Sequence, residues 1–273
     1  MSKPYKIALG TQKGGAGKTT SAVNLAHALT VVDENNRVLV LDFDPQANTT
    51  SILIRPEHIP PKLTIVDIFL SDAIPITDCI LPSKINNVDL IPSTIDAFGL
   101  KTSLSSSSPR QLFALKNKAE QNQAALNKYD FVIIDCQPDI IGPFVANALC
   151  FADHVILPVS SESIYGTDGT NLFLGTMNTF KEVNPKLSLL GVLMTFFRSN
   201  TVVTQTMTEH VRSVFATHGD DIVFNAKIRN STAIGKAELR RTTCLQNNLN
   251  SLVSEDYIDF AKEVIARLKK KTR

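Results

Sequence analysis

The chain has 273 residues, a formal net charge of +2, 43% hydrophobic residues and 20% charged residues, which is the ordinary composition of a soluble globular protein. The nearly balanced charge excludes attraction to nucleic acid through the overall field, so any DNA binding would require a local basic patch. Four widely spaced cysteines without a C-x-x-C pair argue against a zinc site or a disulfide framework and favour reduced thiols in a cytoplasmic protein.

No apolar run approaches the ~18 residues of a membrane span, and the N-terminus contains no segment long enough for a signal peptide. Nothing in the composition marks a domain boundary. We therefore expect one domain over residues 1–273.

Short apolar runs recur along the chain and alternate with segments of helical spacing. Continuous hydrophobicity is typical of strands that are buried on both faces of a parallel sheet. The expected strands are residues 7–9, 38–41, 88–91, 131–134, 155–159 and 189–194. The expected helices are residues 19–30, 109–126, 145–151, 167–180, 204–215 and 256–271. The second of these has Ser108 as N-cap and Pro109 at its first position. This alternation predicts an α/β fold with a doubly wound, mostly parallel central sheet flanked by helices.

A glycine-rich segment, K-G-G-A-G-K-T-T at residues 13–20, lies between the first expected strand and the first expected helix. This is the context that a phosphate-binding loop needs, because glycines let backbone N–H groups converge on an anion at a helix N-terminus. We expect Lys18 to neutralise the β- and γ-phosphates and the Thr19 hydroxyl to ligate Mg²⁺. The residues expected to bind phosphate are Gly14, Gly15, Ala16, Gly17, Lys18, Thr19 and Thr20.

Carboxylates follow two other expected strands. Asp42 and Asp44 lie in the segment D-F-D-P-Q-A-N, and Asp135 ends the run F-V-I-I-D. Ligands bind at the carboxyl ends of strands in an open parallel sheet, so these carboxylates are candidates for holding magnesium and polarising water.

The loop and the D-x-D-P-Q-x-N segment together resemble the ParA/MinD class of P-loop ATPases, whose deviant Walker A loop has a second lysine. Here that lysine is Lys13, and Gln12 replaces the first glycine of the ordinary motif. The Pro-Gln pair after Asp44 favours the ParA branch. The resemblance extends from about residue 7 to about residue 268 and includes the segments 153–162, 191–198 and 223–230.

The resemblance implies roles for the catalytic residues. Lys13 would reach the nucleotide of a partner protomer, Asp44 would orient the attacking water, and Asp42 would help to hold the loop and the metal shell. Asp135, at the Walker B position, would hold Mg²⁺ through water. Arg229 and Asn230 belong to the segment that closes over the adenine base in the family.

The resemblance also implies ATP and Mg²⁺ as cofactors, a homodimer with ATP, non-specific DNA binding, and a ParB-like partner that stimulates slow hydrolysis. Lys236, Arg240 and Arg241 form the densest internal basic group and are the first candidates for DNA contact. Because the loop begins at residue 13, we expect no N-terminal helix-turn-helix domain. The sequence departs from the family at Gln137 and Asp139, after the Walker B carboxylate.

Other interpretations remain open. A MinD-like or other cargo-positioning ATPase could act on membrane or protein, although the C-terminal helix ends in Lys-Lys-Lys-Thr-Arg without a bulky apolar anchor. An iron protein that bridges a cluster would need cysteine ligands, and Cys136 and Cys150 have no motif that resembles such a site. His27 and His154 lack ligand spacing, which favours packed or surface histidines.

Overall fold

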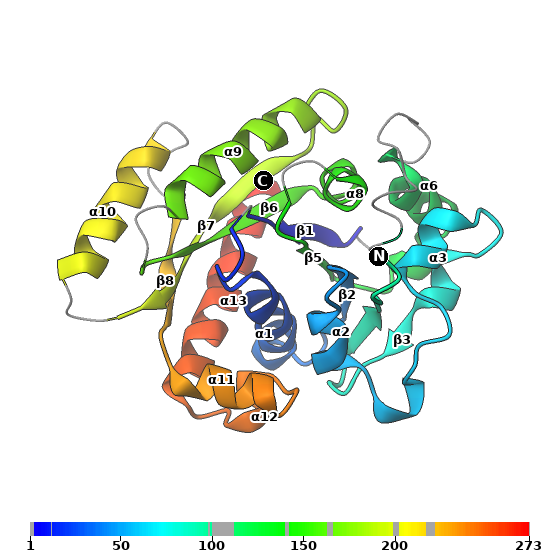
Figure 1. The fold of residues 1–273 in the computed structure, drawn as a ribbon, viewed down its shortest axis with the longest axis horizontal. Coiled ribbons are helices and arrows are strands. Elements are labelled where there is room, and N and C mark those ends of the chain that lie inside the picture. Colours follow the sequence, from blue (N-terminus) through cyan, green and yellow to red (C-terminus); the bar gives the residue numbers. More distant parts are fainter. Residues whose placement is uncertain are drawn as a thin grey trace.

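The computed structural model describes residues 3–11, 13–97, 99, 112–139, 142–162, 166–198, 202–216 and 222–272. In this part of the chain, eight strands form one sheet in the order β3-β4-β2-β5-β1-β6-β7-β8 (Figure 1). The strands are β1 (Tyr5–Leu9), β2 (Val38–Phe43), β3 (Leu81–Pro82), β4 (Val88–Ile91), β5 (Phe131–Cys136), β6 (His154–Ser160), β7 (Ser188–Phe197) and β8 (Val223–Arg229).

All neighbouring strands are parallel except β3, which runs antiparallel to β4. This confirms the predicted fold class. The sequence did not predict β3, which is too short to produce an apolar run. It also did not predict β8 as a buried strand, because β8 lies at the sheet edge and the four residues other than Val223, Phe224 and Ile228 are partly or fully exposed.

Helices cover both faces of the sheet (Figure 1). One face packs against α1, α2, α11, α12 and α13, and the other packs against α3, α6, α8, α9 and α10. Their bounds are α1 (Lys18–Val32), α2 (Asn48–Leu53), α3 (Ile65–Leu70), α6 (Ala114–Gln121), α7 (Gln123–Leu126), α8 (Pro143–Phe151), α9 (Gly166–Phe180), α10 (Val202–Phe215), α11 (Thr232–Leu239), α12 (Cys244–Asn247) and α13 (Leu252–Thr272). Two 3-10 helices, Pro56–His58 and Ile76–Cys79, lie in the connections.

Each face of the sheet carries a hydrophobic core, and successive residues of the central strand β1 point alternately into one and the other. Ile7 and Leu9 pack with α1 and α13, whereas Ala8 packs on the opposite face. All three are fully buried. This double burial explains why the strands read as continuous apolar runs in the sequence.

The helix predicted over residues 109–126 is not continuous. In the described part, α6 and α7 are separated at Asn122, whose φ of −116° and ψ of 28° are not helical. The Asn122 side chain donates to the Lys118 carbonyl, so a local hydrogen bond competes with helix continuation. The predicted start at Ser108 and Pro109 lies outside the described residues. The last helix begins at Leu252, earlier than predicted.

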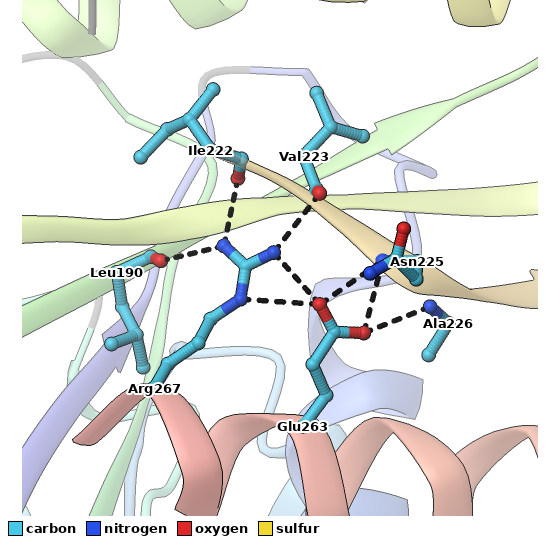
Figure 2. Close-up of polar contacts among 7 residues, drawn as sticks. All are labelled: Leu190, Ile222, Val223, Asn225, Ala226, Glu263 and Arg267. Carbon is cyan, nitrogen blue, oxygen red and sulfur yellow. Dashed lines mark hydrogen bonds and ion pairs between the residues drawn. The ribbon is translucent and has the colours of Figure 1, made fainter. Parts of the chain in front are cut away.

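A partly buried ion pair on α13 attaches this helix to the sheet edge (Figure 2). The Arg267 guanidinium donates to the carbonyls of Leu190, Ile222 and Val223 at 2.9–3.1 Å. Glu263 accepts from the N–H groups of two residues of β8, Asn225 and Ala226, at 2.9–3.1 Å. The Arg267 and Glu263 side chains are also 2.8 Å apart and only 15% and 18% exposed.

The β7–β8 pairing is irregular at this point. Val192 lies opposite Val223, but Met194 lies opposite Lys227, so β8 has additional residues between the two pairs. The additional residues have main-chain groups that find no hydrogen-bond partner in the neighbouring strand. The ion pair of α13 supplies these partners. The helix therefore fixes the path of β8 toward the carboxyl edge of the sheet.

No helix in the described residues is both long and apolar enough to cross a membrane.

We expect Arg267→Met to lower the free energy of unfolding by about 2 kcal/mol, because it leaves the partly buried Glu263 carboxylate without its cation and several carbonyls without a donor. Denaturant unfolding measures this change. Lys262→Met is the control, because its pair with Asp259 on the same helix is 60% and 66% exposed; its loss should cost about 0.5 kcal/mol. Equal, small costs for both variants would show that the Arg267–Glu263 pair does not stabilise the edge.

Candidate functional site

The glycine-rich loop lies at the point where the sheet changes its winding direction. It connects β1 to α1, and β1 pairs with β5 on one side and with β6 on the other. In an open parallel sheet this position, at the carboxyl edge, is the usual ligand site. The strands β2 and β5, which carry the candidate carboxylates, end at the same edge.

The loop depends on glycine at two positions. Gly15 and Gly17 have φ values of 74° and 79°, in the left-handed region that other residues rarely adopt. Gly17 is also the N-cap of α1. Between them, Ala16 is 3% exposed, and its carbonyl accepts a hydrogen bond from the Thr195 hydroxyl of β7 at 3.0 Å. The loop is thus held in shape by its neighbours.

Lys18 lies inside the loop. Its side chain is 6% exposed, and the ammonium group donates to the Lys13 carbonyl at 3.1 Å. Burial lowers the pKa of Lys18 below its ordinary value, while Asp135 opposes this shift. The second lysine, Lys13, is half-buried at the start of the loop. The loop therefore holds one cation inside and carries another at its beginning.

Asp135 is fully buried beside the loop. Its Oδ2 atom accepts hydrogen bonds from the hydroxyls of Thr19 and Thr49, both at 2.8 Å. Its Oδ1 atom is buried and has no hydrogen-bond partner among the described residues. Burial raises the pKa of Asp135 to about 6, against the hydrogen bonds that lower it. A buried acceptor without a partner, next to a threonine hydroxyl, fits the oxygen chemistry of a hydrated Mg²⁺.

Asp42 is the neighbour of Asp135 across the sheet. Its Oδ2 atom accepts from the backbone N–H and the hydroxyl of Thr50 at 2.8 and 2.7 Å, and its Oδ1 atom accepts from the N–H of Asp44 at 3.1 Å. Burial, together with the charge of Asp135, raises the pKa of Asp42 to about 7. Asp42 therefore holds the turn after β2, and its part in a metal shell stays a prediction.

Asp44 opens onto a pocket of about 340 Å³ in front of the loop. Its Oδ1 atom accepts from the N–H of Gln46 at 2.9 Å, which orients the carboxylate. The pocket brings together Asp44 and six of the residues that the sequence predicted to bind phosphate. It is lined by Gly14, Gly15, Gly17, Lys18, Thr19, Thr20, Asp44, Asn48, Ser51, Ile52, Pro138 and Glu238.

A second pocket, of about 390 Å³, adjoins the first and shares Gly15, Gly17, Thr20 and Glu238 with it. Its other lining residues come from the carboxyl ends of β7 and β8 and from α1, α11 and α13: Ser21, Thr195, Phe196, Ile228, Asn230, Ser231, Ile234, Gly235 and Tyr257. Phe196 has a φ of 53°, unusual for an aromatic residue. Its carbonyl accepts from the Ser161 hydroxyl at 2.8 Å, a contact that helps to hold this conformation.

The two residues predicted to contact the adenine base lie differently. Asn230 lines the second pocket, and its Nδ2 atom donates to Glu162 at 2.7 Å. The Arg229 guanidinium is bound by both carboxylate oxygens of Asp256 on α13, at 2.6 Å each, and does not line either pocket. A base contact from Asn230 fits this geometry better than one from Arg229.

The predicted DNA-contact residues lie beside the pockets. Lys236 is on α11, and Arg240 and Arg241 follow its end. All three are exposed. Arg240 donates to the side chain of Asn247 at 2.8 Å, and Arg241 has a φ of 52°, a conformation usually taken by glycine after a helix.

The residues that depart from the family pattern, Gln137 and Asp139, flank a residue of the pocket wall. Pro138 lines the first pocket. Gln137 is 5% exposed, and its Nε2 atom has no hydrogen-bond partner among the described residues. Cys136 and Cys150 are buried in the core. The described residues contain no group of three or more potential metal-binding side chains of His, Cys, Asp or Glu, so they offer no support for the iron-protein alternative.

Three residues of the site were not predicted from the sequence as functional. Thr49 and Thr50 on α2 hold the two buried carboxylates, and Glu238 on α11 borders both pockets. Each meets a partner that is distant in the chain, except Thr50, which follows Asp42 closely. The only signal in the sequence was the position of Thr49 and Thr50, whose hydroxyls follow the D-P-Q segment closely.

The fold and the site define a P-loop NTPase with a deviant Walker A loop. Residues 5–189 match the family model described as AAA domain. The sporulation initiation inhibitor protein Soj of Bacillus subtilis is 34% identical over 95% of this chain and 98% of its own length. The chain belongs to the ParA/Soj family of partition ATPases.

Solved structures agree with the fold. Cobyrinic acid a,c-diamide synthase from Mycobacterium smegmatis, with bound ADP and magnesium, has a TM-score of 0.76 and 28% identity, covering 99% of this chain and 97% of that one. A putative plasmid partition protein from Borrelia burgdorferi, bound to AMPPNP, has a TM-score of 0.74 and 26% identity, covering 98% and 100% of the two chains.

We expect Asp135→Asn to change how stability depends on pH in the absence of metal and nucleotide. The folded-state pKa of about 6 lies above the ordinary value, so ionisation destabilises the folded wild type as pH rises from about 4 to about 7. The variant cannot ionise at this position. Its free energy of unfolding, relative to wild type, should increase by about 1–3 kcal/mol between pH 5 and pH 8.

Urea unfolding at the two pH values measures this difference. The exposed carboxylate Asp259 provides the matched control, because Asp259→Asn removes one charge where water already solvates it. A relative stability of Asp135→Asn that does not change with pH would contradict the raised pKa.

Proposed function

We propose that this protein is a dimerising ATPase that drives plasmid or chromosome partition. It binds Mg·ATP, forms a homodimer with ATP, and binds DNA without sequence preference in that state. The observation that carries this proposal is the first pocket, where the loop with two lysines, the Thr19–Asp135 hydrogen bond and the Asp44 carboxylate come together. The nucleotides in the solved relatives described above support ATP and Mg²⁺ as cofactors.

The residues of the first pocket would have different roles in binding Mg·ATP. Lys18 and the loop amides would bind the phosphates. The Lys18 ammonium group would then leave the Lys13 carbonyl to which it now donates. Thr19 and Asp135 would hold Mg²⁺, which supplies charge neutralisation on the phosphates when bound. Asp44, fixed by the Gln46 N–H, would orient the attacking water.

Lys13 would act across the dimer. It stands at the beginning of the loop and is only half-buried, while Lys18 already occupies the interior. A second cation in this position can reach phosphates presented by a partner protomer. Slow hydrolysis would then release the dimer, so that ATP sets the lifetime of the DNA-bound state.

The basic group of Lys236, Arg240 and Arg241 would bind DNA through the phosphate backbone. These side chains are exposed and follow one another along α11 and the turn after it. We also propose a ParB-like partner that stimulates hydrolysis, a single domain over residues 1–273, and a cytoplasmic location with nucleoid association in the ATP state.

The membrane alternative receives no support from α13. The apolar side chains Tyr257, Phe260, Val264 and Leu268 are at most 1% exposed, packed in the core with α1 and the sheet. An interfacial helix must offer its apolar face to lipid. On α13 that face is already occupied.

We expect two variants of the first pocket to fail at opposite steps. Lys13→Gln should bind ATP but remain monomeric, because the cation for the partner's phosphates is gone. Asp44→Ala should form the ATP dimer and hold it, with turnover reduced about 100-fold, within the range that general-base positioning contributes. Light scattering after size exclusion and phosphate release measure both steps. A Lys13→Gln protein that dimerises with ATP, or an Asp44→Ala protein with wild-type turnover, would overturn the assigned role.

We expect the double substitution Arg240→Ala and Arg241→Ala to weaken binding to random-sequence duplex DNA in the ATP state about tenfold and to reduce its salt dependence. Fluorescence anisotropy over a salt series measures both effects. Lys62→Ala with Lys128→Ala removes the same charge from two exposed positions outside the group. Equal losses in the two double variants would show that only net charge matters.

A further inference from the structure

The two pockets meet at a carboxylate that the family resemblance did not single out. Glu238 and Thr20 line both pockets, together with two glycines of the loop. Glu238 lies near the end of α11, whereas Thr20 lies in the first turn of α1. A negatively charged group therefore stands at the border of a site that is otherwise built to receive phosphate.

Thr20 fixes the position of this carboxylate. Its hydroxyl donates to Oε1 of Glu238 at 2.8 Å, joining residues that are 218 positions apart in the sequence. The helix that carries Glu238 is itself anchored: the Ser231 side chain caps its start, and Ala237 is 2% exposed in the core. The carboxylate is thus held at the border by its own helix and by the phosphate-binding loop.

The chemistry of a nucleotide limits what Glu238 can contact. A carboxylate only accepts hydrogen bonds, so it repels the phosphates and selects a donor. The first pocket has Lys18 and the loop for the phosphates. The second pocket has Phe196, Ile228 and Tyr257, which suit an aromatic base. The sugar joins base to phosphates, and its hydroxyls are the donors that fall at the border.

We propose that Glu238 is a specificity-determining residue that accepts a hydrogen bond from a ribose hydroxyl and so selects ribonucleotides over deoxyribonucleotides. This inference rests on the proposed nucleotide binding and adds the sugar to it. The Thr20 hydroxyl has a positioning role, because it orients the carboxylate toward the border. A site that holds a buried or oriented acceptor rejects the analogue that lacks the donor.

The test is calorimetric titration with ADP, 2′-deoxyADP and 3′-deoxyADP in the presence of Mg²⁺. Diphosphates keep the measurement on the monomer, so that ATP-driven dimerisation does not contribute. Unlabelled nucleotides are required, since fluorescent groups attached to the ribose would block the contact under test. The proteins are the wild type, Glu238→Ala, Glu238→Gln and, as the matched control, Glu209→Gln, an exposed glutamate on α10 that lines neither pocket.

The wild type and Glu209→Gln should bind ADP about tenfold more tightly than at least one deoxy analogue, the value of one hydrogen bond to a charged acceptor. In Glu238→Ala the ratio should fall to within about twofold, through weaker ADP binding. Glu238→Gln, which keeps a neutral acceptor and the side-chain volume, should give an intermediate ratio.

Two results would overturn the inference while leaving nucleotide binding intact. In one, the wild type binds all three nucleotides equally. In the other, Glu238→Ala binds all three more tightly by the same factor, which would mean that the carboxylate only repels phosphate. A wild type that binds no ADP would instead overturn the proposed function, and the inference with it.

Discussion

The site depends on two carboxylates that lie side by side in a dry sheet. Asp42 and Asp135 occupy paired positions on β2 and β5, and both are fully buried. Such a pair is stable only where hydrogen bonds and a cation compensate for lost hydration. Thr19, Thr49 and Thr50 supply the hydrogen bonds, and they tie the start of α1 and the start of α2 to the same edge of the sheet.

This constraint links the order of the loop to the order of the turn after β2. The hydroxyl of Thr19 belongs to the phosphate-binding helix, and the N–H of Asp44 belongs to the turn that would orient water. Both are held by the buried pair, so on the proposed function phosphate binding and water positioning would share one electrostatic centre. The open acceptor on Asp135 then marks where a further positive charge would complete the compensation.

Local patterns in the sequence predicted the parts of the fold that local forces determine. Continuous apolar runs gave the parallel strands, and the glycines at residues 14, 15 and 17 gave the loop. The break at Asn122 was missed because a side-chain hydrogen bond competes there with good helix propensity. Thr49 and Glu238 were missed because their partners, Asp135 and Thr20, are 86 and 218 residues away, and only the folded sheet brings them together.

The helix α11 combines two features that a nucleotide-controlled DNA-binding protein needs. Glu238 lines the two pockets, and Arg240 and Arg241 follow the end of the helix in the exposed turn. A ligand can change DNA affinity only if its contacts differ between the states that bind DNA well and poorly. On the proposed function, the ribose hydroxyl would reach Glu238 in both the ADP and the ATP state, so this contact distinguishes nucleotide-bound from empty protein and acts on the helix that precedes the two arginines. The γ-phosphate must then supply the difference between the two bound states. Arg241 has a left-handed backbone conformation that glycine adopts without steric strain. On the proposed function, the charge of its side chain, rather than the stability of the turn, explains an arginine at this position.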